Sequence, residues 1–146
     1  MNITTKRQSW LPLGAALALA FAVFGSYATI AAAADVKVTL AGDQEAPPVT
    51  STATGTGTIT VGADKSVHGS VTTKGIAGIA AHVHEAPAGK SGPVVIPLEK
   101  KGDTYAVPAN AKLTDAQFAS FKAGNMYVNV HSAAHPDGEI RGQLKP

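Results

Sequence analysis

Ala80-Ala81-His82-Val83-His84-Glu85-Ala86-Pro87 is the stretch around which this chain of 146 residues is organised. Successive side chains of an extended strand point to opposite faces. His82 and His84 therefore leave the backbone on the same side, about 7 Å apart at their Cα atoms. Two imidazoles at this spacing form a chelating pair for a metal ion. The stretch predicts a β-strand with a metal-binding face.

A second histidine-bearing stretch runs from Asn129 to Pro136, and the two stretches together hold four of the five histidines in the chain. One histidine on a strand is more often a surface or hydrogen-bonded residue than a ligand. A pair joined by a third histidine from another strand is the arrangement of an all-imidazole site. We predict His82, His84 and His131 as metal ligands, with His135 as the fourth.

Alternation of apolar and polar residues, with turn residues between the segments, predicts short strands through most of the chain. In the first of them, Val36, Val38 and Leu40 alternate with polar residues. Strands at such regular intervals predict an all-β fold, either an antiparallel β-sandwich or a Greek-key barrel. Besides the strand carrying the histidine pair, the predicted strands are 36–40, 53–61, 66–73, 94–98, 125–131 and 139–144.

One short helix, from Thr114 to Ala123, is predicted to interrupt the strands. Thr114 and Gln117 form a capping box, in which each side chain satisfies a backbone N–H group at the helix start. Phe118 and Phe121 lie on one face of this helix, and the following glycine supplies a left-handed stop. We expect the helix to cover one side of the core, with a partner-binding groove as the alternative.

The last two strands are joined by Pro136-Asp137-Gly138, a turn signal that predicts a hairpin. If the hydrophobic faces of these strands coincide, His131 and Arg141 share the opposite face. Arg141 is then predicted to act in catalysis by attracting and orienting an anion beside the metal site. The alternative is a surface cation paired with Glu85 or Glu139.

The N-terminal segment has the parts of a secretory signal peptide. A basic start is followed by an apolar run from Leu11 to Tyr27 and by small residues that end in an A-x-A site at 32–34. We predict residues 1–34 to be the signal peptide and residues 35–146 to be one β domain, which is periplasmic or secreted. A retained membrane anchor is the alternative.

Charge and cysteine content restrict the function of the exported domain. Without Lys6 and Arg7, ten of the twelve basic residues remain, against ten acidic residues. A near-neutral domain gives no support to nucleic-acid binding or to a basic membrane-binding patch, and no stable membrane anchor is expected after cleavage. The chain has no cysteine, so its stability depends on the core or on a bound metal rather than on disulfides.

A series of motifs resembles the CHRD family, the domain first described in chordin. The resemblance covers nearly the whole mature chain, in order, and implies a secreted all-β domain. The motifs are Gly42-Asp43-Gln44-Glu45-Ala46-Pro47-Pro48-Val49, Ala53-Thr54-Gly55, His82-Val83-His84-Glu85-Ala86-Pro87-Ala88, Gly92-Pro93-Val94-Val95, Leu113, Gly124, Tyr127-Val128-Asn129-Val130-His131 and Pro136-Asp137-Gly138-Glu139-Ile140-Arg141-Gly142-Gln143.

A more local resemblance is to the copper-zinc superoxide dismutases. The strand with His82 and His84 is similar to the one that presents two copper ligands in that family, and Val130-His131 is similar to its last copper-ligand strand. Gly138-Glu139-Ile140-Arg141 is similar to the segment bearing its substrate-guiding arginine. The family's disulfide and its zinc-binding loop are both missing here. The resemblance therefore implies a site that binds copper only.

The ligand types also indicate the metal. Imidazole nitrogens suit copper, zinc, iron and nickel, whereas calcium and magnesium prefer oxygen ligands. We expect copper, with zinc or iron as alternatives, and we expect Glu45 and Glu85 to accept hydrogen bonds from the ligand imidazoles. His68 lies in a strand without partners and is predicted to be structural.

Three functions follow from this site. The first is a copper-dependent superoxide dismutase with superoxide as its small anionic substrate, which is the function we favour at this point. The second is a periplasmic copper-binding or carrier protein without turnover. The third is a secreted interaction module in which the histidines are incidental. The sequence carries no signal for the oligomeric state.

Overall fold

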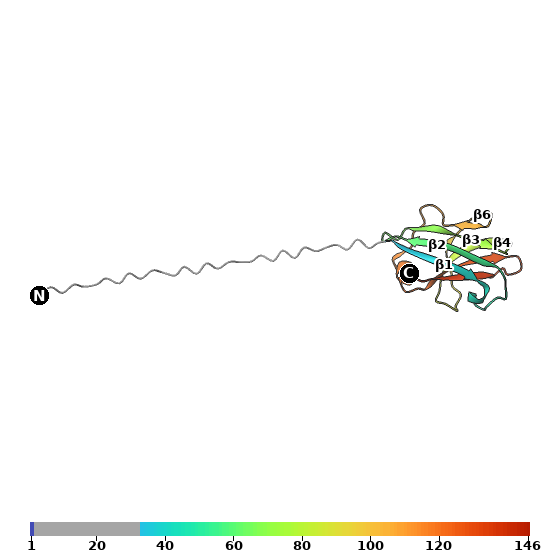
Figure 1. The fold of residues 1–146 in the computed structure, drawn as a ribbon, viewed down its shortest axis with the longest axis horizontal. Coiled ribbons are helices and arrows are strands. Elements are labelled where there is room, and N and C mark those ends of the chain that lie inside the picture. Colours follow the sequence, from blue (N-terminus) through green and yellow to red (C-terminus); the bar gives the residue numbers. More distant parts are fainter. Residues whose placement is uncertain (2–32) are drawn as a thin grey trace.

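The computed structural model describes Met1 and residues 33–146, and Figure 1 shows its fold. The predicted signal peptide falls almost entirely outside the described residues, so it stays a prediction. No helix in the described part of the chain is long and apolar enough to cross a membrane.

The described residues form one antiparallel sheet, one short α-helix and one 3₁₀ turn. The strands are β1 (Ala34–Ala41), β2 (Thr54–Val61), β3 (Val67–Lys74), β4 (Gly78–Glu85), β5 (Val94–Pro97), β6 (Glu99–Lys101), β7 (Thr104–Ala106), β8 (Met126–Ser132) and β9 (Ile140–Leu144). The 3₁₀ turn is η1 (Gly42–Gln44), and the α-helix is α1 (Asp115–Lys122).

The sheet curls into a nearly closed barrel. Its nine strands follow the order β5-β4-β8-β9-β1-β2-β3-β7-β6, so β5 and β6 are the two edges. Only Leu98 separates these two strands in the chain, and its backbone N–H donates to the carbonyl of Ala81 in β4 at 2.9 Å. The two edges of the sheet therefore meet. Of the two predicted all-β architectures, the structure has the barrel.

The hairpin of β6 and β7 was not predicted. All three residues of β6 are exposed, and the sequence Glu-Lys-Lys has no alternation of apolar and polar side chains that would indicate a strand. These residues are extended because they pair with β7, where Lys100 lies opposite Tyr105. Tyr105, 1% exposed, fixes the hairpin to the core.

Alternation along the strands separates the inside of the barrel from its outside. In β8, Val128 and Val130 are fully buried in the hydrophobic core, which also contains Leu40 of β1 and Ile59 of β2. The intervening β8 residues must point to the outer face. One of these, Asn129, is also buried. Loops therefore cover this part of the outer face.

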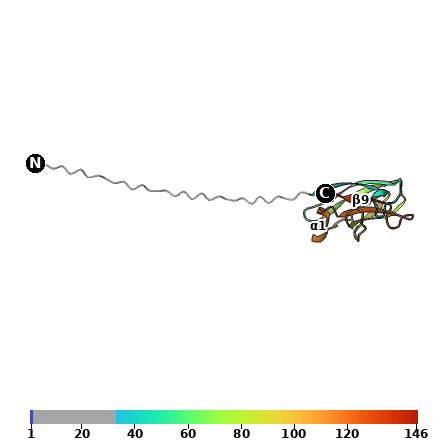
Figure 2. The same cartoon turned by 90° about the horizontal axis from the view of Figure 1, so that it is seen from below.

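Helix α1 has the predicted capping box. The Thr114 hydroxyl accepts from the backbone N–H of Gln117, and the Gln117 side chain accepts from the backbone N–H of Thr114. Phe121 is 1% exposed and belongs to the core, with Phe118 packed against it. Figure 2 shows this helix at the same end of the barrel as the C-terminus. The helix thus covers part of the core, as predicted.

Candidate metal centre

Three of the predicted ligands meet on the outer face of the barrel. His82 and His84 lie on β4, and His131 lies on the neighbouring β8. Each residue offers one ring nitrogen, and these three nitrogens lie within 4.8 Å of one another. In the register of the two strands, His131 faces Ala80 and is therefore diagonal to His82. This convergence is the one predicted from strand parity.

Two backbone carbonyls fix the orientation of two of the rings. Nδ1 of His84 lies 2.9 Å from the carbonyl of Gly92, and Nδ1 of His131 lies 2.8 Å from the carbonyl of Pro136. A carbonyl can only accept a hydrogen bond, so both Nδ1 atoms carry the proton and both Nε2 atoms keep a lone pair. Histidine ligands of metal ions are generally held in this way.

The third ring bonds directly to another histidine. Nδ1 of His82 and Nε2 of His131 are 3.0 Å apart. Because His131 has its proton on Nδ1, His82 is the donor of this hydrogen bond. An ion bound by both of these nitrogens would take the place of that proton, and His82 would carry its proton on Nε2 instead.

Burial favours the neutral form of His82 and His84. His84 is 7% exposed, and His82 and His131 are half-buried. Burial is the largest cause that lowers the pKa of His82 and of His84 from the ordinary value, and the charge of a protonated His131 lowers both further. Neutral imidazoles keep the lone pair that a metal ion needs.

Three buried side-chain atoms in the described part of the chain have no hydrogen-bond partner, namely His84 Nε2, Asn129 Oδ1 and Glu45 Oε1. Asn129 acts on the ionisation of both other groups, since it lowers the pKa of Glu45 and opposes the lowering of the pKa of His84. A buried polar atom without a partner costs about 1–3 kcal/mol. Because both His84 Nε2 and Asn129 Oδ1 are acceptors, a cation is one group that would satisfy them. The donor set and its environment fit a metal ion.

Glu45 adds an unusual carboxyl group to this network. Burial, the largest cause, raises the pKa of Glu45 to about 6, although Arg141 and Asn129 act in the opposite direction. Gly138 packs against the pair, since a Cβ there would lie 2.5 Å from Glu45 Oε1 and 2.8 Å from Asn129 Nδ2. Our sequence reasoning did not single out Asn129. Its position between Tyr127 and His131 on the polar face of β8 was the available signal.

The expectation that Glu45 and Glu85 accept hydrogen bonds from the ligand imidazoles is wrong. Glu85 accepts a hydrogen bond from the Ser120 hydroxyl, and Glu45 faces Asn129. The acceptors are instead the carbonyls described above. Carbonyls of loops were not foreseen because loop conformation leaves no periodic pattern in the sequence.

His135 and His68 lie outside the cluster. His135 is half-buried, and its backbone N–H bonds to the carbonyl and the hydroxyl oxygen of Ser132, both at 3.2 Å, which shapes the turn after β8. Its role as a fourth ligand stays a prediction. His68 is exposed on β3, away from the other histidines in the sheet order.

Arg141 shares the outer face with the histidines but is 1% exposed. Its guanidinium donates to the carbonyls of Lys90 and Pro87, at 2.7 and 3.1 Å, and to Gln143 Oε1 at 2.8 Å. Neither of the carboxylates considered from the sequence forms an ion pair with it in the described residues. Arg141 is therefore neither an exposed cation nor half of a surface ion pair.

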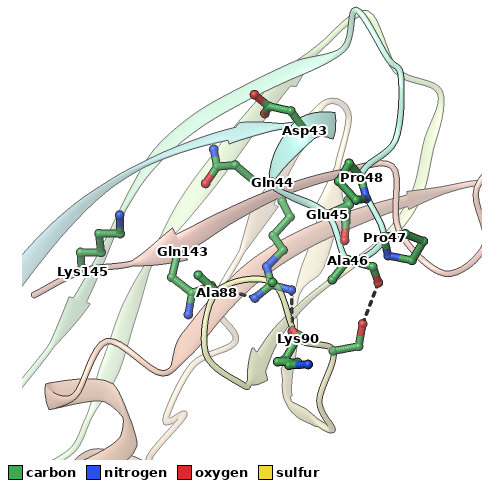
Figure 3. A pocket seen from close by; sticks show the side chains of 13 residues that line it. Asp43, Gln44, Glu45, Ala46, Pro47, Pro48, Ala88, Lys90, Gln143 and Lys145 are labelled. Carbon is green, nitrogen blue, oxygen red and sulfur yellow. Dashed lines mark hydrogen bonds between the residues drawn. The ribbon is translucent and has the colours of Figure 1, made fainter.

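A cleft of about 560 Å³ lies on the same outer face, and Figure 3 shows it at close range. Glu45, Pro47 and Pro48 border it from one loop, and Ala88 and Lys90 border it from another. Arg141 lines it from β9 together with neighbouring side chains. None of the three clustered histidines is among its lining residues.

Residues 36–144 match the family model described as CHRD domain. This match covers nearly all of the described barrel. No curated protein and no solved structure matches the chain. These comparisons add no evidence for the local resemblance to superoxide dismutases.

Proposed function

This chain belongs to the CHRD domain family, and we propose that it binds one copper ion through His82, His84 and His131. The observation that carries this proposal is the Nε2 atom of His84. It is buried, has no partner, and is fixed as an acceptor by the hydrogen bond of Nδ1 to Gly92. His84 also belongs to a group of three histidines whose ligand nitrogens, one from each ring, lie within 4.8 Å of one another, and an acceptor held in such a group suits a cation.

Copper is the metal that this ligand set favours. Nitrogen ligands bind Cu²⁺ more tightly than the other divalent ions of the first transition series, including zinc. The chain offers no thiolate, and soft sulfur ligands are not needed for a His₃ site. Zinc is the main alternative because its catalytic and structural sites also use imidazole.

Binding without turnover is the function we propose ahead of superoxide dismutation. Electrostatic attraction of an anion needs a cation whose field reaches the solvent. The guanidinium of Arg141 is buried, and acceptors within the protein already engage it at three short distances. His82 and His131 remain partly exposed, so a partner or small ligand has access to the ion. A copper carrier or buffer needs only a site that binds the ion and leaves it accessible.

The N-terminal segment indicates the compartment in which the domain acts. Residues 1–34 have the parts of a signal peptide. We therefore propose that the domain binds copper outside the cytoplasm, in the periplasm or after secretion.

The test is metal binding by the purified domain in competition with a chelator of known affinity. We expect one Cu²⁺ per chain, an electron paramagnetic resonance spectrum with nitrogen hyperfine coupling, and loss of both in His84→Ala. His68→Ala is the matched control, because it removes an exposed imidazole from β3 and should leave binding unchanged. A Cu²⁺ affinity of His84→Ala equal to that of wild type would refute the proposed site. A superoxide assay on the copper-loaded sample tests the enzymatic alternative, which requires turnover above that of copper-histidine complexes.

A further inference from the structure

Arg141 ties one loop to the barrel. A buried charge is stable only when its hydrogen-bonding groups are satisfied. Two of the three acceptors of Arg141 are carbonyls of the segment 86–93, which joins β4 to β5, namely those of Pro87 and Lys90. The same segment is also held by Gln143, which donates to the carbonyl of Ala86 at 2.9 Å.

This loop also carries the peptide group that orients His84. The carbonyl of Gly92 accepts from His84 Nδ1, and the N–H of Gly92 donates to the Tyr127 hydroxyl at 3.3 Å. A Cβ at position 92 would collide with the carbonyl oxygen of Glu85. The Gly92 peptide is thus packed closely and bonded on both sides, and a shift of the loop would move the acceptor of His84.

Tyr127 forms a second connection between Arg141 and His84. The ring of Tyr127 stacks on that of His84, with centroids 4.8 Å apart and an interplanar angle of 6°. The guanidinium carbon of Arg141 lies 3.4 Å from the centroid of the Tyr127 ring. β8 lies between β4 and β9 in the sheet, so His84 and Arg141 approach Tyr127 from neighbouring strands on its two sides.

We propose that Arg141 is a positioning residue for the metal site: it clamps the 86–93 loop and the Tyr127 ring, so that the Gly92 carbonyl holds His84 with Nε2 free to bind a cation. This inference deepens the proposed function and rests on it for the metal-binding readout. The tautomer of His84 is a property of the metal-free protein, so it tests the clamp even if copper does not bind.

The proposal differs sharply from a steering role for the same residue. A steering cation changes the rate at which an anion arrives, with a strong dependence on ionic strength, and leaves metal affinity unchanged. A clamp changes the tautomer of His84 and the affinity for the metal. Residues that orient metal ligands typically alter affinity by about tenfold to a hundredfold.

The experiment compares wild type with Arg141→Gln. The His84 tautomer is read from ¹⁵N chemical shifts of the metal-free protein, loop motion from amide hydrogen exchange at Gly92, and Cu²⁺ affinity from chelator competition. We expect a single Nδ1–H tautomer in wild type. In Arg141→Gln we expect a mixture of tautomers, exchange at Gly92 faster by about tenfold or more, and Cu²⁺ affinity lower by about tenfold to a hundredfold.

Two further variants keep the test decisive. Lys145→Ala removes an exposed cation from the same cleft and should change none of the three readouts. Tyr127→Phe keeps the ring stack and removes only the hydroxyl that receives the Gly92 N–H; it should shift tautomer and exchange in the same direction as Arg141→Gln, by less. If Arg141→Gln does not fold, Arg141→Lys takes its place, because lysine keeps the positive charge but loses the planar fork of N–H donors.

The opposing outcomes are distinct. A folded Arg141→Gln or Arg141→Lys protein with the wild-type tautomer and wild-type exchange at Gly92 would overturn the clamp. If the tautomer shifts as expected but wild type binds no Cu²⁺, the clamp stands and the proposed copper function fails.

Discussion

Nδ1 of His82 and Nε2 of His131 lie 3.0 Å apart on neighbouring strands. They share one proton, which places two potential ligand atoms of the site in contact before any ion binds. His84 supplies the third nitrogen from the same strand as His82. A cation that enters therefore replaces one hydrogen bond and satisfies one atom that had no partner. The first two predictions follow from this arrangement.

The first prediction concerns the three histidines. His82→Ala and His131→Ala should each weaken Cu²⁺ binding by at least tenfold to a hundredfold, because two imidazoles form a much weaker chelate than three. His84→Ala should be at least as severe, because it removes the one nitrogen that has no other partner. Chelator competition at pH 7.5 measures the affinities.

His135→Ala separates the predicted fourth ligand from a residue that only shapes the turn. Its backbone bonds to Ser132 remain in the variant, so the turn should persist. A change in the nitrogen hyperfine pattern of bound Cu²⁺ would assign His135 to the metal. An unchanged spectrum and affinity would exclude it.

The second prediction concerns pH. Burial lowers the pKa of His82 and His84, so both are neutral at and above the ordinary histidine pKa of about 6.5. Cu²⁺ affinity should therefore be nearly constant from about pH 8 to 6.5 and should fall only at lower pH, as protons compete for the rings. Binding at pH 7.5 should release almost no protons.

Calorimetry in two buffers of different ionisation enthalpy measures this proton release. The proton between His82 and His131 stays on the protein when the ion binds, because His82 can carry it on Nε2 instead of Nδ1. Release of one proton or more per ion at pH 7.5 would contradict the neutral state expected of His82 and His84. It would indicate that a histidine is charged in the metal-free state.

The third prediction concerns Glu45. Its pKa is raised from 4.5 to about 6 by burial, so the folded protein binds more protons than the unfolded chain between these pH values. Stability must then fall as pH rises through this window. Glu45→Gln should raise the free energy of unfolding of the metal-free protein by about 1–2 kcal/mol at pH 8, and the gain should disappear near pH 4.

Urea denaturation at pH 8 and at pH 4 measures these free energies of unfolding. Glu139→Gln is a control for which the change in stability is expected to have the opposite sign. The Ser132 hydroxyl is the largest cause that lowers the pKa of Glu139, so this carboxylate stabilises the fold above its unfolded pKa and stops doing so as pH falls. Glu139→Gln should therefore destabilise at pH 8 and have little effect at acid pH. Equal effects of the two substitutions would contradict a raised pKa of Glu45 in the folded protein.

The fourth prediction concerns the helix. Thr114→Ala removes the hydroxyl that accepts from the Gln117 N–H and should lower the free energy of unfolding by about 1 kcal/mol. Gln117→Ala removes the reciprocal bond to the Thr114 N–H and should cost less, because that N–H reaches water readily. Copper affinity should be unchanged in both variants, since α1 contributes no residue to the histidine cluster. A large loss of affinity would indicate that the helix supports the site.

The sequence by itself determined the local geometry. Alternation along the chain predicted most of the strands and the all-β fold, and strand parity placed His82 beside His84 and His131 on the face of Arg141. The capping box likewise predicted where α1 begins. Each of these features depends on neighbours within a few residues, and such neighbours leave a periodic pattern that can be read directly.

Only the tertiary structure decided how these pieces meet. The register of β4 against β8 placed His131 diagonal to His82. The pairing of β6 with β7 made β6 the second edge strand, which lies beside the first edge strand, β5, and nearly closes the barrel. The loop over the outer face buried Arg141 and supplied the carbonyl for His84. Register and loop packing arise from contacts between residues far apart in the chain, so no local pattern records them. The same arginine that parity placed beside the site became a buried clamp because a loop folded over it.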